Sequence, residues 1–431
     1  MATTLEQALR FQKDHSVLTP PTSPPDPASK HDPGAAATPT TVQFALRNNT
    51  SSANVFAYVT GLDVGRDSRV VMLRSDGQTT YYPTNPGADL QPLGDDCAIP
   101  LAGPGQTRTV TVPRMVGGRV WFVQDARLTF LLNRAAGDKA ALVEPSVVNP
   151  SDPNRELRWS FCEFTLNETE LFANISYVDF VSHPIALVLE SGNGGSTQRV
   201  EGIEPDGLAR VAAEMARQHE RDGAGWDRLV VRAGGGSGSG ELLRVVSPNT
   251  GIHMVDGLFS GYYAGYVDAV WKKYASADLV VNTQAQWGDK KGRVVDDKLV
   301  FSADVGAFPR PSARDIFSSD SGALAPPPGS DPPVARNVAA RLAAAFNRAT
   351  LLVNAAQPQG EVPATYYREA VCNHYSRVLH EVNTDGRGYA FPYDDVGPSG
   401  GSEQAGTVAD SNPKLFTIIL GGRRGAMAHK L

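Results

Sequence analysis

Short runs of alternating apolar and polar residues follow one another between residues 41 and 191 of this chain. They include TVQFALRN, ANVFAYVTG, RVVMLRS, GRVWFVQ and IALVLES, with Gly, Pro, Asn or Asp between them. Because successive side chains of a strand point to opposite faces, this pattern predicts short β-strands that bury one face. Short strands at this spacing predict a mainly β domain, built as a β-sandwich or a β-barrel.

Helical patterns appear among strands after about residue 191. In EPDGLARVAAEMARQHE, Leu208, Val211 and Met215 follow helical spacing, which predicts an amphipathic helix. We predict further helices over three ranges: 262–275, 334–353 and 364–382. Strand-like runs such as DRLVVR and ELLRVVS lie between them, so the middle of the chain is predicted to be mixed α/β.

The chain is predicted to have three parts. Residues 1–40 are rich in proline and hold little to bury, as in an extended, disordered tail. A lone strand at the C-terminus, KLFTIILGG, needs neighbours, and the β-rich first half offers them. We therefore predict one β domain from 41–190 with 383–431, and an inserted α/β domain at 191–382.

Charge and cysteine content exclude several classes of protein. The formal net charge is -6 and the pI about 5.8, which argues against a nucleic-acid-binding surface. No apolar run approaches the roughly 18 residues of a membrane helix. The three cysteines and the histidines match no paired metal-binding spacing, so no metal site and no cofactor are expected.

Two acidic residues lie inside the aromatic stretch WSFCEFTLNETELFANISYVDFV at 159–181. Strands are depleted in Asp and, less strongly, in Glu, so the presence of Glu163 and Asp179 indicates either that they face a polar surface or that they have a function. If the first run is a strand, Thr165 and Asn167 share the face of Glu163. A pair of carboxyl groups can hydrolyse a glycosidic bond, because one protonates the leaving oxygen and the other activates water.

The register of the two runs decides their chemistry. A hairpin symmetric about Leu171 would place Glu163 directly opposite Asp179, whereas an offset or an intervening strand would separate them. Separations of about 6.5–9.5 Å suit an inverting glycosidase, and about 5 Å suits a retaining one. Desolvation beside Phe161 favours Glu163 as the acid and leaves Asp179 as the base. The alternative is that both acids face solvent or pair with an arginine such as Arg158.

The same stretch resembles the active-site region of glycoside hydrolase family 64, β-1,3-glucanases related in fold to thaumatin-like proteins. The resemblance extends through VQFALRNNTSSANVFAYVTG, RVVSPNTG, GYYAGYVDAVW, GYAFPYDDVG and LFTIILGG. It implies a thaumatin-like β domain with an inserted α/β domain and an open groove between them. It also implies inverting endo-hydrolysis of β-1,3-glucan by Glu163 and Asp179, with release of short laminari-oligosaccharides.

The resemblance implies further site residues as well. Thr165 and Asn167 are expected to touch the sugar, and Asp394 to bind sugar hydroxyls or, alternatively, to form a turn. Phe172 stands where we expect the family to have a tryptophan, which leaves less area for stacking on a sugar ring.

The partner implied is a β-1,3-glucan polysaccharide, bound by a monomer. Family members are secreted, so an extracellular location is expected, although the N-terminus lacks the pattern of a signal peptide. One alternative is a non-catalytic thaumatin-like module that binds β-glucan. A second is an unrelated α/β enzyme whose site lies in the inserted region.

Overall fold

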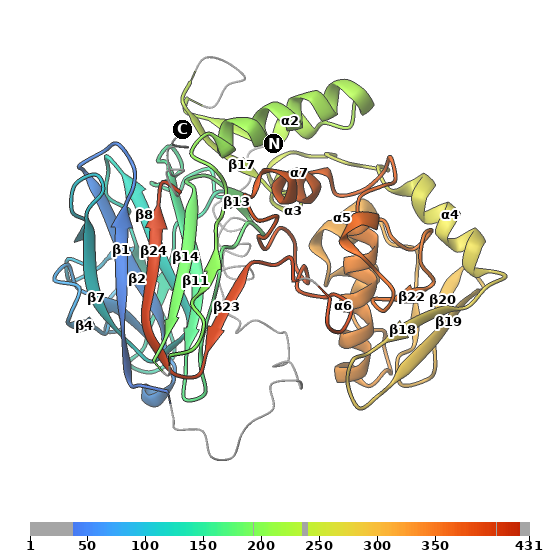
Figure 1. Cartoon of the computed structure of the whole chain (residues 1–431), viewed down its shortest axis with the longest axis horizontal. Helices are drawn as coiled ribbons and strands as arrows, with labels where there is room; N and C mark the ends of the chain where they lie inside the picture. The colour runs from blue at the N-terminus through green and yellow to red at the C-terminus, as the bar shows by residue number, and fades with distance from the viewer. Residues whose placement is uncertain (1–37, 193, 235–239, 402, 423–431) are drawn as a thin grey trace, which may run out of the picture.

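The structure, a computed structural model, describes residues 38–422 except 193, 235–239 and 402. Figure 1 shows two large sheets on one side of the molecule and most of the helices, with smaller sheets, on the other. The chain is therefore mainly β with an α/β part, as the alternation of apolar residues predicted. The tail predicted over 1–40 lies almost entirely outside the described residues.

Two sheets form the β-rich half. In spatial order, the five-stranded sheet holds β15 (Gln198–Val200), β14 (Ile185–Ser191), β24 (Pro413–Leu420), β1 (Thr41–Asn48) and β7 (Thr107–Pro113). The eight-stranded sheet holds β23 (Thr407–Asp410), β12 (Leu171–Asn174), β11 (Trp159–Leu166), β8 (Met115–Gln124), β2 (Val55–Asp63), β3 (Arg69–Leu73) and β4 (Thr80–Tyr81), with β6 (Ile99–Pro100) paired to β2. Neither sheet closes on itself within the described strands, so of the two predicted architectures the sandwich is observed.

Aromatic side chains pack the space between the two sheets. The ring of Phe44 on β1 lies 5.0 Å from that of Phe164 on β11 and 4.9 Å from that of Phe416 on β24, edge to face. Gly118 on β8 lies opposite Phe164, and a Cβ there would come within 2.5 Å of the Phe164 ring. Such interdigitation fixes how the eight-stranded sheet lies on its partner.

The C-terminal strand lies in the middle of the five-stranded sheet. β24 runs parallel to β1 and antiparallel to β14. The prediction that this strand pairs with the β-rich half is confirmed, although residues 191–382 intervene in the chain. The domain limits at 190 and 383 stay a prediction.

Helices and small sheets make up the rest. The α-helices are α2 (Gly207–Asp222), α3 (Pro248–Met254), α4 (Ala264–Tyr274), α5 (Ala313–Ser318), α6 (Pro332–Arg348) and α7 (His374–Val382). The short 3-10 helices are η1 (Val64–Arg66), η2 (Trp226–Leu229), η3 (Gly322–Leu324) and η4 (Pro363–Thr365). Three smaller sheets accompany them. One contains β13 (Phe180–Val181), β17 (Leu242–Val246) and β16 (Val230–Arg232), and another contains β10 (Ala140–Val143), β9 (Leu131–Arg134) and β5 (Gln91–Pro92). The third, outside the sandwich, consists of five shorter strands: β21 (Ala307–Phe308), β20 (Lys298–Val300), β19 (Asp289–Val295), β18 (Leu279–Asn282) and β22 (Ala356–Gln357).

The helices test the predictions from spacing. Leu208, Val211 and Met215 are buried on α2, as predicted. The helix predicted over 364–382 is wrong in length, since α7 begins only at His374, where the Asn373 side chain accepts a hydrogen bond from the Ser376 amide. Within the described chain, no helix combines the length and the apolar character needed to span a membrane.

Candidate active site

Pairing of β11 with β8 gathers charged and aromatic side chains on the outer face of the eight-stranded sheet. Cys162 and Phe164 point toward the sandwich core, whereas Phe161 and Glu163 take the opposite face. Across the strand pair, Phe161 lies opposite Trp121, and Glu163 lies opposite Arg119. This face turns toward α3 and β13 rather than toward the five-stranded sheet, so the polar end of β11 adjoins the α/β part.

One arginine holds two glutamates. The Arg119 guanidinium donates through Nε and Nη2 to Glu163 Oε1, at 3.3 and 3.2 Å. Its Nη1 donates to Glu144 Oε2, at 2.6 Å, just beyond the end of β10. The guanidinium also lies over the Phe161 ring, 4.8 Å from its centroid. The sequence left Arg158 as a possible partner of Glu163, but the observed partner is Arg119.

Burial and charge act against each other in this cluster. Burial alone would lower the pKa of Arg119, but the carboxylates of Glu144, Glu163 and Asp179 raise it above its ordinary value. Burial raises the pKa of Glu144, although Arg119 and a hydrogen bond from Thr60 oppose that shift. Three carboxylates thus act on one guanidinium, and Glu144, the most deeply buried part of this arrangement, is the carboxyl whose pKa burial raises.

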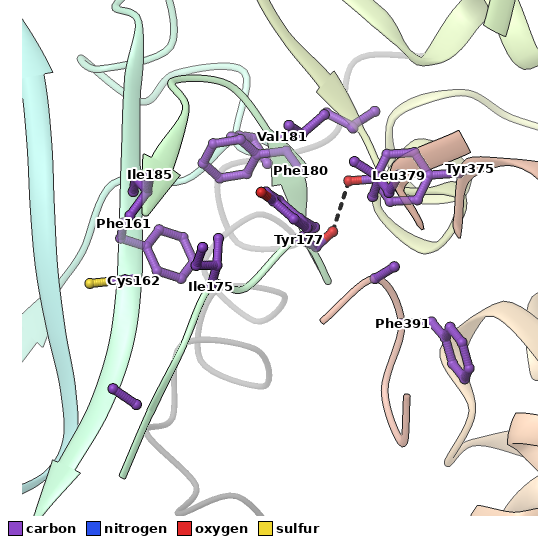
Figure 2. Packing of buried hydrophobic residues seen from close by; sticks show 14 of the residues in the cluster. Phe161, Cys162, Ile175, Tyr177, Phe180, Val181, Ile185, Tyr375, Leu379 and Phe391 are labelled. Carbon is purple, nitrogen blue, oxygen red and sulfur yellow. Dashed lines mark hydrogen bonds between the residues drawn. The ribbon is translucent and has the colours of Figure 1, made fainter. Parts of the chain in front are cut away.

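Asp179 reaches the same cluster from a different segment. It lies between β12 and β13, and its backbone oxygen accepts a hydrogen bond from the Ser247 amide at 2.8 Å. Two residues earlier, the carbonyl of Tyr177 accepts a hydrogen bond from the Tyr375 hydroxyl of α7, at 2.8 Å, as Figure 2 shows. Both contacts tie the Asp179 segment to the α/β part.

A pocket open to solvent lies between these segments. Arg119, Glu144 and Asp179 line it together with aromatic side chains of β8, β11 and β13 and with residues of α3. The lining residues are Arg119, Trp121, Glu144, Pro145, Ser146, Val147, Val148, Trp159, Phe161, Asp179, Phe180, Asn249, Thr250 and His253. Glu163 is not one of these lining residues, but it is hydrogen-bonded to Arg119, which is, and the Glu163 side chain is 35% exposed.

The observed register separates the two predicted acids. β11 and β12 form an antiparallel hairpin in which Glu163 lies opposite Asn174, so the register symmetric about Leu171 is wrong. The second predicted strand, NISYVDFV, is also wrong as a single element: β12 ends at Asn174, and β13 belongs to another sheet. Glu163 and Asp179 therefore face Arg119 from two elements rather than from paired positions.

Three of the predicted binding residues lie on the hairpin. Thr165 and Phe172 are cross-strand partners, both partly exposed and on the face of Glu163. Asn167 lies just beyond β11, where its Oδ1 accepts hydrogen bonds from Thr169 and from the Glu170 amide. The Asn167 oxygen thus stabilises the turn, whereas Thr165 and Phe172 border the proposed acid.

Asp394 lies elsewhere. Its side chain is 0% exposed and is bonded to Arg348 at 3.0 Å, to His380 at 3.0 Å and to the Ala390 amide at 3.0 Å. A carboxylate enclosed in this way has no surface to offer a sugar hydroxyl. The geometry therefore gives the predicted binding role of Asp394 no support and assigns it a place in a buried ion cluster.

Sequence reasoning missed Arg119 and Glu144. Arg119 alternates with Trp121 in GRVWFVQ, a period-two signal that put the two on one face without saying which strand lies beside them. Glu144, the first residue of EPSVV, directly follows the short strand β10, and no motif around it indicates a functional role. Among the described residues, no group of three or more His, Cys, Asp or Glu is arranged to hold a metal ion.

Comparison with known proteins agrees with the sequence resemblance. The model of the glycoside hydrolase 64 family, described as beta-1,3-glucanase, matches residues 40–420. A glucan endo-1,3-beta-glucosidase of Cellulosimicrobium cellulans is 31% identical over 393 residues, which cover 90% of this chain. The match covers 66% of that relative, so this chain spans just under two thirds of its length.

Solved structures match over most of the chain. The crystal structure of a laminaripentaose-producing beta-1,3-glucanase in complex with laminaritetraose is 30% identical, with a TM-score of 0.76, and the match covers 89% of this chain and 99% of that one. A beta-1,3-glucanase domain from Clostridium beijerinckii is 19% identical, with a TM-score of 0.66, over 90% of this chain and 99% of that one. The second likeness bears on the fold alone.

Proposed function

The chain belongs to the β-1,3-glucanase family of glycoside hydrolases, family 64, and on that premise we propose that it hydrolyses internal bonds of β-1,3-glucan. The name of the C. cellulans relative and the laminaritetraose bound to the solved glucanase support this substrate class. We also propose the finer relation of its β domain to thaumatin-like proteins, which rests on the sequence resemblance.

The observation that carries the proposal is the cluster around Arg119. Two carboxylates on separate elements, Glu163 on β11 and Asp179 before β13, both act on this guanidinium at the edge of a pocket open to solvent. Hydrolysis of an acetal needs a proton donor and a water-activating base on either side of one bond. The proposed mechanism requires a sugar and a water to fit between these two carboxyls.

In the proposed mechanism, Glu163 donates its proton to the glycosidic oxygen as the bond from that oxygen to C1 breaks. Asp179 takes a proton from a water, whose oxygen attacks C1 from the opposite face. The products are a new non-reducing end and a reducing sugar of inverted, α configuration. Short laminari-oligosaccharides are the expected products.

The hairpin is proposed to bind the sugar chain. Thr165 offers a hydroxyl and Phe172 an aromatic face beside Glu163, and an open surface suits a polymer that is cut internally. Asn167 would contribute its amide nitrogen, because its oxygen is engaged in the turn.

Two substitutions test the catalytic roles. Glu163→Gln and Asp179→Asn keep the size of each side chain but remove proton transfer, so each is expected to reduce curdlan and laminarin hydrolysis by at least about 1,000-fold. Glu168→Gln is the matched control, since Glu168 lies on the same hairpin, has an 85% exposed side chain and should be dispensable. NMR of the products should detect the α-anomer first.

The outcomes separate the candidate functions. Activity that survives Glu163→Gln or Asp179→Asn would contradict the assigned roles, and a β-anomer formed first would contradict inversion. Binding to insoluble curdlan without release of oligosaccharides would indicate the non-catalytic glucan-binding module instead. If the protein neither binds curdlan nor releases oligosaccharides, an unrelated enzyme with its site in the α/β part would be favoured.

A further inference from the structure

Glu144 is a buried carboxylate to which the proposed mechanism gives no part. Its side chain is 4% exposed, and its Oε2 accepts the 2.6 Å hydrogen bond from Arg119. Its Oε1 accepts a hydrogen bond from the Thr60 hydroxyl at 3.1 Å, and that hydroxyl accepts one from the Trp121 indole at 3.0 Å. Burial of an unpaired carboxylate would destabilise the fold, and both oxygens of Glu144 have hydrogen-bond partners that offset this cost. Arg119 is the one charged partner among them, so the negative charge of Glu144 bears on Arg119.

Arg119 connects Glu144 to the proposed proton donor. Both Nε and Nη2 of Arg119 donate to Oε1 of Glu163, while Nη1 is held by Glu144. Among the described residues, no hydrogen bond reaches Oε2 of Glu163. The rigid, planar fork of the guanidinium can therefore fix one oxygen of Glu163 and leave the other to hold a proton.

We propose that Glu144 is a positioning residue that, through Arg119, orients the Glu163 carboxyl and keeps it able to carry the proton for the glycosidic oxygen. The inference rests on the proposed function for the role of Glu163. The charged and titratable groups that face Arg119 are Glu144 next to β10, Glu163 on β11 and Asp179 before β13; His253 of α3 lines the same pocket.

The charge of Glu144 has a direction of effect that can be measured. Ionised Glu144 offsets the positive charge of Arg119, which would otherwise favour loss of the proton from Glu163. Removal of that negative charge leaves Arg119 to act on Glu163 without compensation. Because the acid must be protonated, the alkaline limb of the kcat/KM profile should then move to lower pH.

Glu144→Gln tests this, because glutamine keeps the size and can still accept the hydrogen bond from Arg119 through its amide oxygen, while its amide nitrogen faces the Thr60 hydroxyl and the negative charge is lost. We expect the alkaline limb to move down by about one pH unit, and kcat to fall roughly 10-fold with a smaller change in KM. In 13C-labelled protein, the Glu163 carboxyl signal, assigned by its absence in Glu163→Gln, should titrate at lower pH in Glu144→Gln than in the unsubstituted protein. Glu144→Asp keeps the charge and should restore the position of the limb.

Glu361→Gln is the matched control. Glu361 is also a buried glutamate beside a buried arginine, 3.7 Å from Arg348, in the α/β part. It should lower thermal stability without moving the pH profile. If Glu144→Gln does the same, with the Glu163 titration unchanged, Glu144 is merely structural and the inference is wrong. If the unsubstituted protein releases no oligosaccharide, the proposed function fails, and the Glu163 titration alone decides whether Glu144 controls that carboxyl.

Discussion

At the scale of single residues, the alternation of side chains along β11 decides which of them lie on the outer face of the sheet. Glu163 and Thr165 lie on the outer face of β11 because they alternate with Cys162 and Phe164, which are buried in the sandwich. A lysine in place of Arg119 would keep the charge but lose the fork that spans two carboxylates. The proposed site therefore depends on the identity of Arg119 as well as on its charge.

Phe172 provides a prediction at this scale. It lies on the exposed hairpin face opposite Thr165, where an aromatic ring can stack on a sugar. We expect Phe172→Ala to raise KM for laminari-oligosaccharides about fivefold, equivalent to a loss of about 1 kcal/mol of binding, and Phe172→Trp to lower KM through its larger ring. Steady-state kinetics on laminarihexaose measures both. Equal KM values in all three proteins would remove Phe172 from the binding surface.

At the scale of elements, local pattern predicted the strands but not where they separate. Alternation from 174 to 181 predicted one strand, yet the chain leaves the hairpin after Asn174. The reason is tertiary: the Tyr177 amide donates to the Tyr389 carbonyl at 2.7 Å, and its carbonyl is held by Tyr375. Both partners are distant in sequence, so the alternation of apolar and polar residues could not predict the end of the strand that brings Asp179 to Arg119.

Contacts between residues distant in sequence also limited how much of the candidate site could be predicted. The shared face of Glu163 and Thr165 followed from period two and is observed. The proximity of Glu144 to Arg119 depends on how β10 and its following loop pack against the eight-stranded sheet, which the sequence alone did not indicate. Asp394 was predicted to be available to a ligand because it lies in a loop. It is instead buried by Arg348 and His380, which are distant in sequence, so no local pattern indicates its burial.

The contact of Tyr375 with Tyr177 gives a prediction for the element it supports. Tyr375→Phe removes the donor to a buried carbonyl and should lower the free energy of unfolding by about 1–2 kcal/mol. Because the Asp179 segment loses an anchor, kcat should also fall several-fold. Urea unfolding and laminarin kinetics measure the two effects.

Tyr274→Phe is the control for that change. Tyr274 on α4 is also fully buried, and its hydroxyl donates to the Leu351 carbonyl at 2.7 Å, within the α/β part. It should lower stability similarly and leave kcat unchanged. An equal fall in kcat in both variants would mean that Tyr375 acts on stability alone.

At the scale of the whole molecule, a buried ion cluster ties together elements that lie far apart in the chain. Arg348 ends α6, His380 lies on α7, and both bind Asp394 in the segment that leads back to the β-rich half. Arg348 Nη2 also donates to the Asp394 carbonyl at 2.7 Å. The cluster thus joins the last helices to the return of the chain toward β23 and β24.

The His380–Asp394 pair should make stability depend on pH. Burial alone would lower the pKa of His380 and raise that of Asp394, but their mutual attraction reverses both shifts, so the pKa of His380 is raised and that of Asp394 is lowered. The contribution of His380 is complete below its unfolded pKa of about 6.5 and is lost as pH rises through the folded value. That of Asp394 is present above its unfolded value of about 4 and is lost at lower pH.

His380→Gln should therefore lower the free energy of unfolding most between about pH 4 and pH 6.5, and less at pH 9, where the imidazole of the unsubstituted protein is neutral. His183→Gln is the control of opposite sign: burial lowers the pKa of His183 to about 3, so unsubstituted His183 loses its contribution as pH falls below about 6.5. The cost of His183→Gln should thus shrink toward acid while that of His380→Gln grows. Urea unfolding of the three proteins at pH 5 and pH 9 measures this, and parallel pH dependences in the two variants would show that the His380–Asp394 pair does not carry the charge assigned to it.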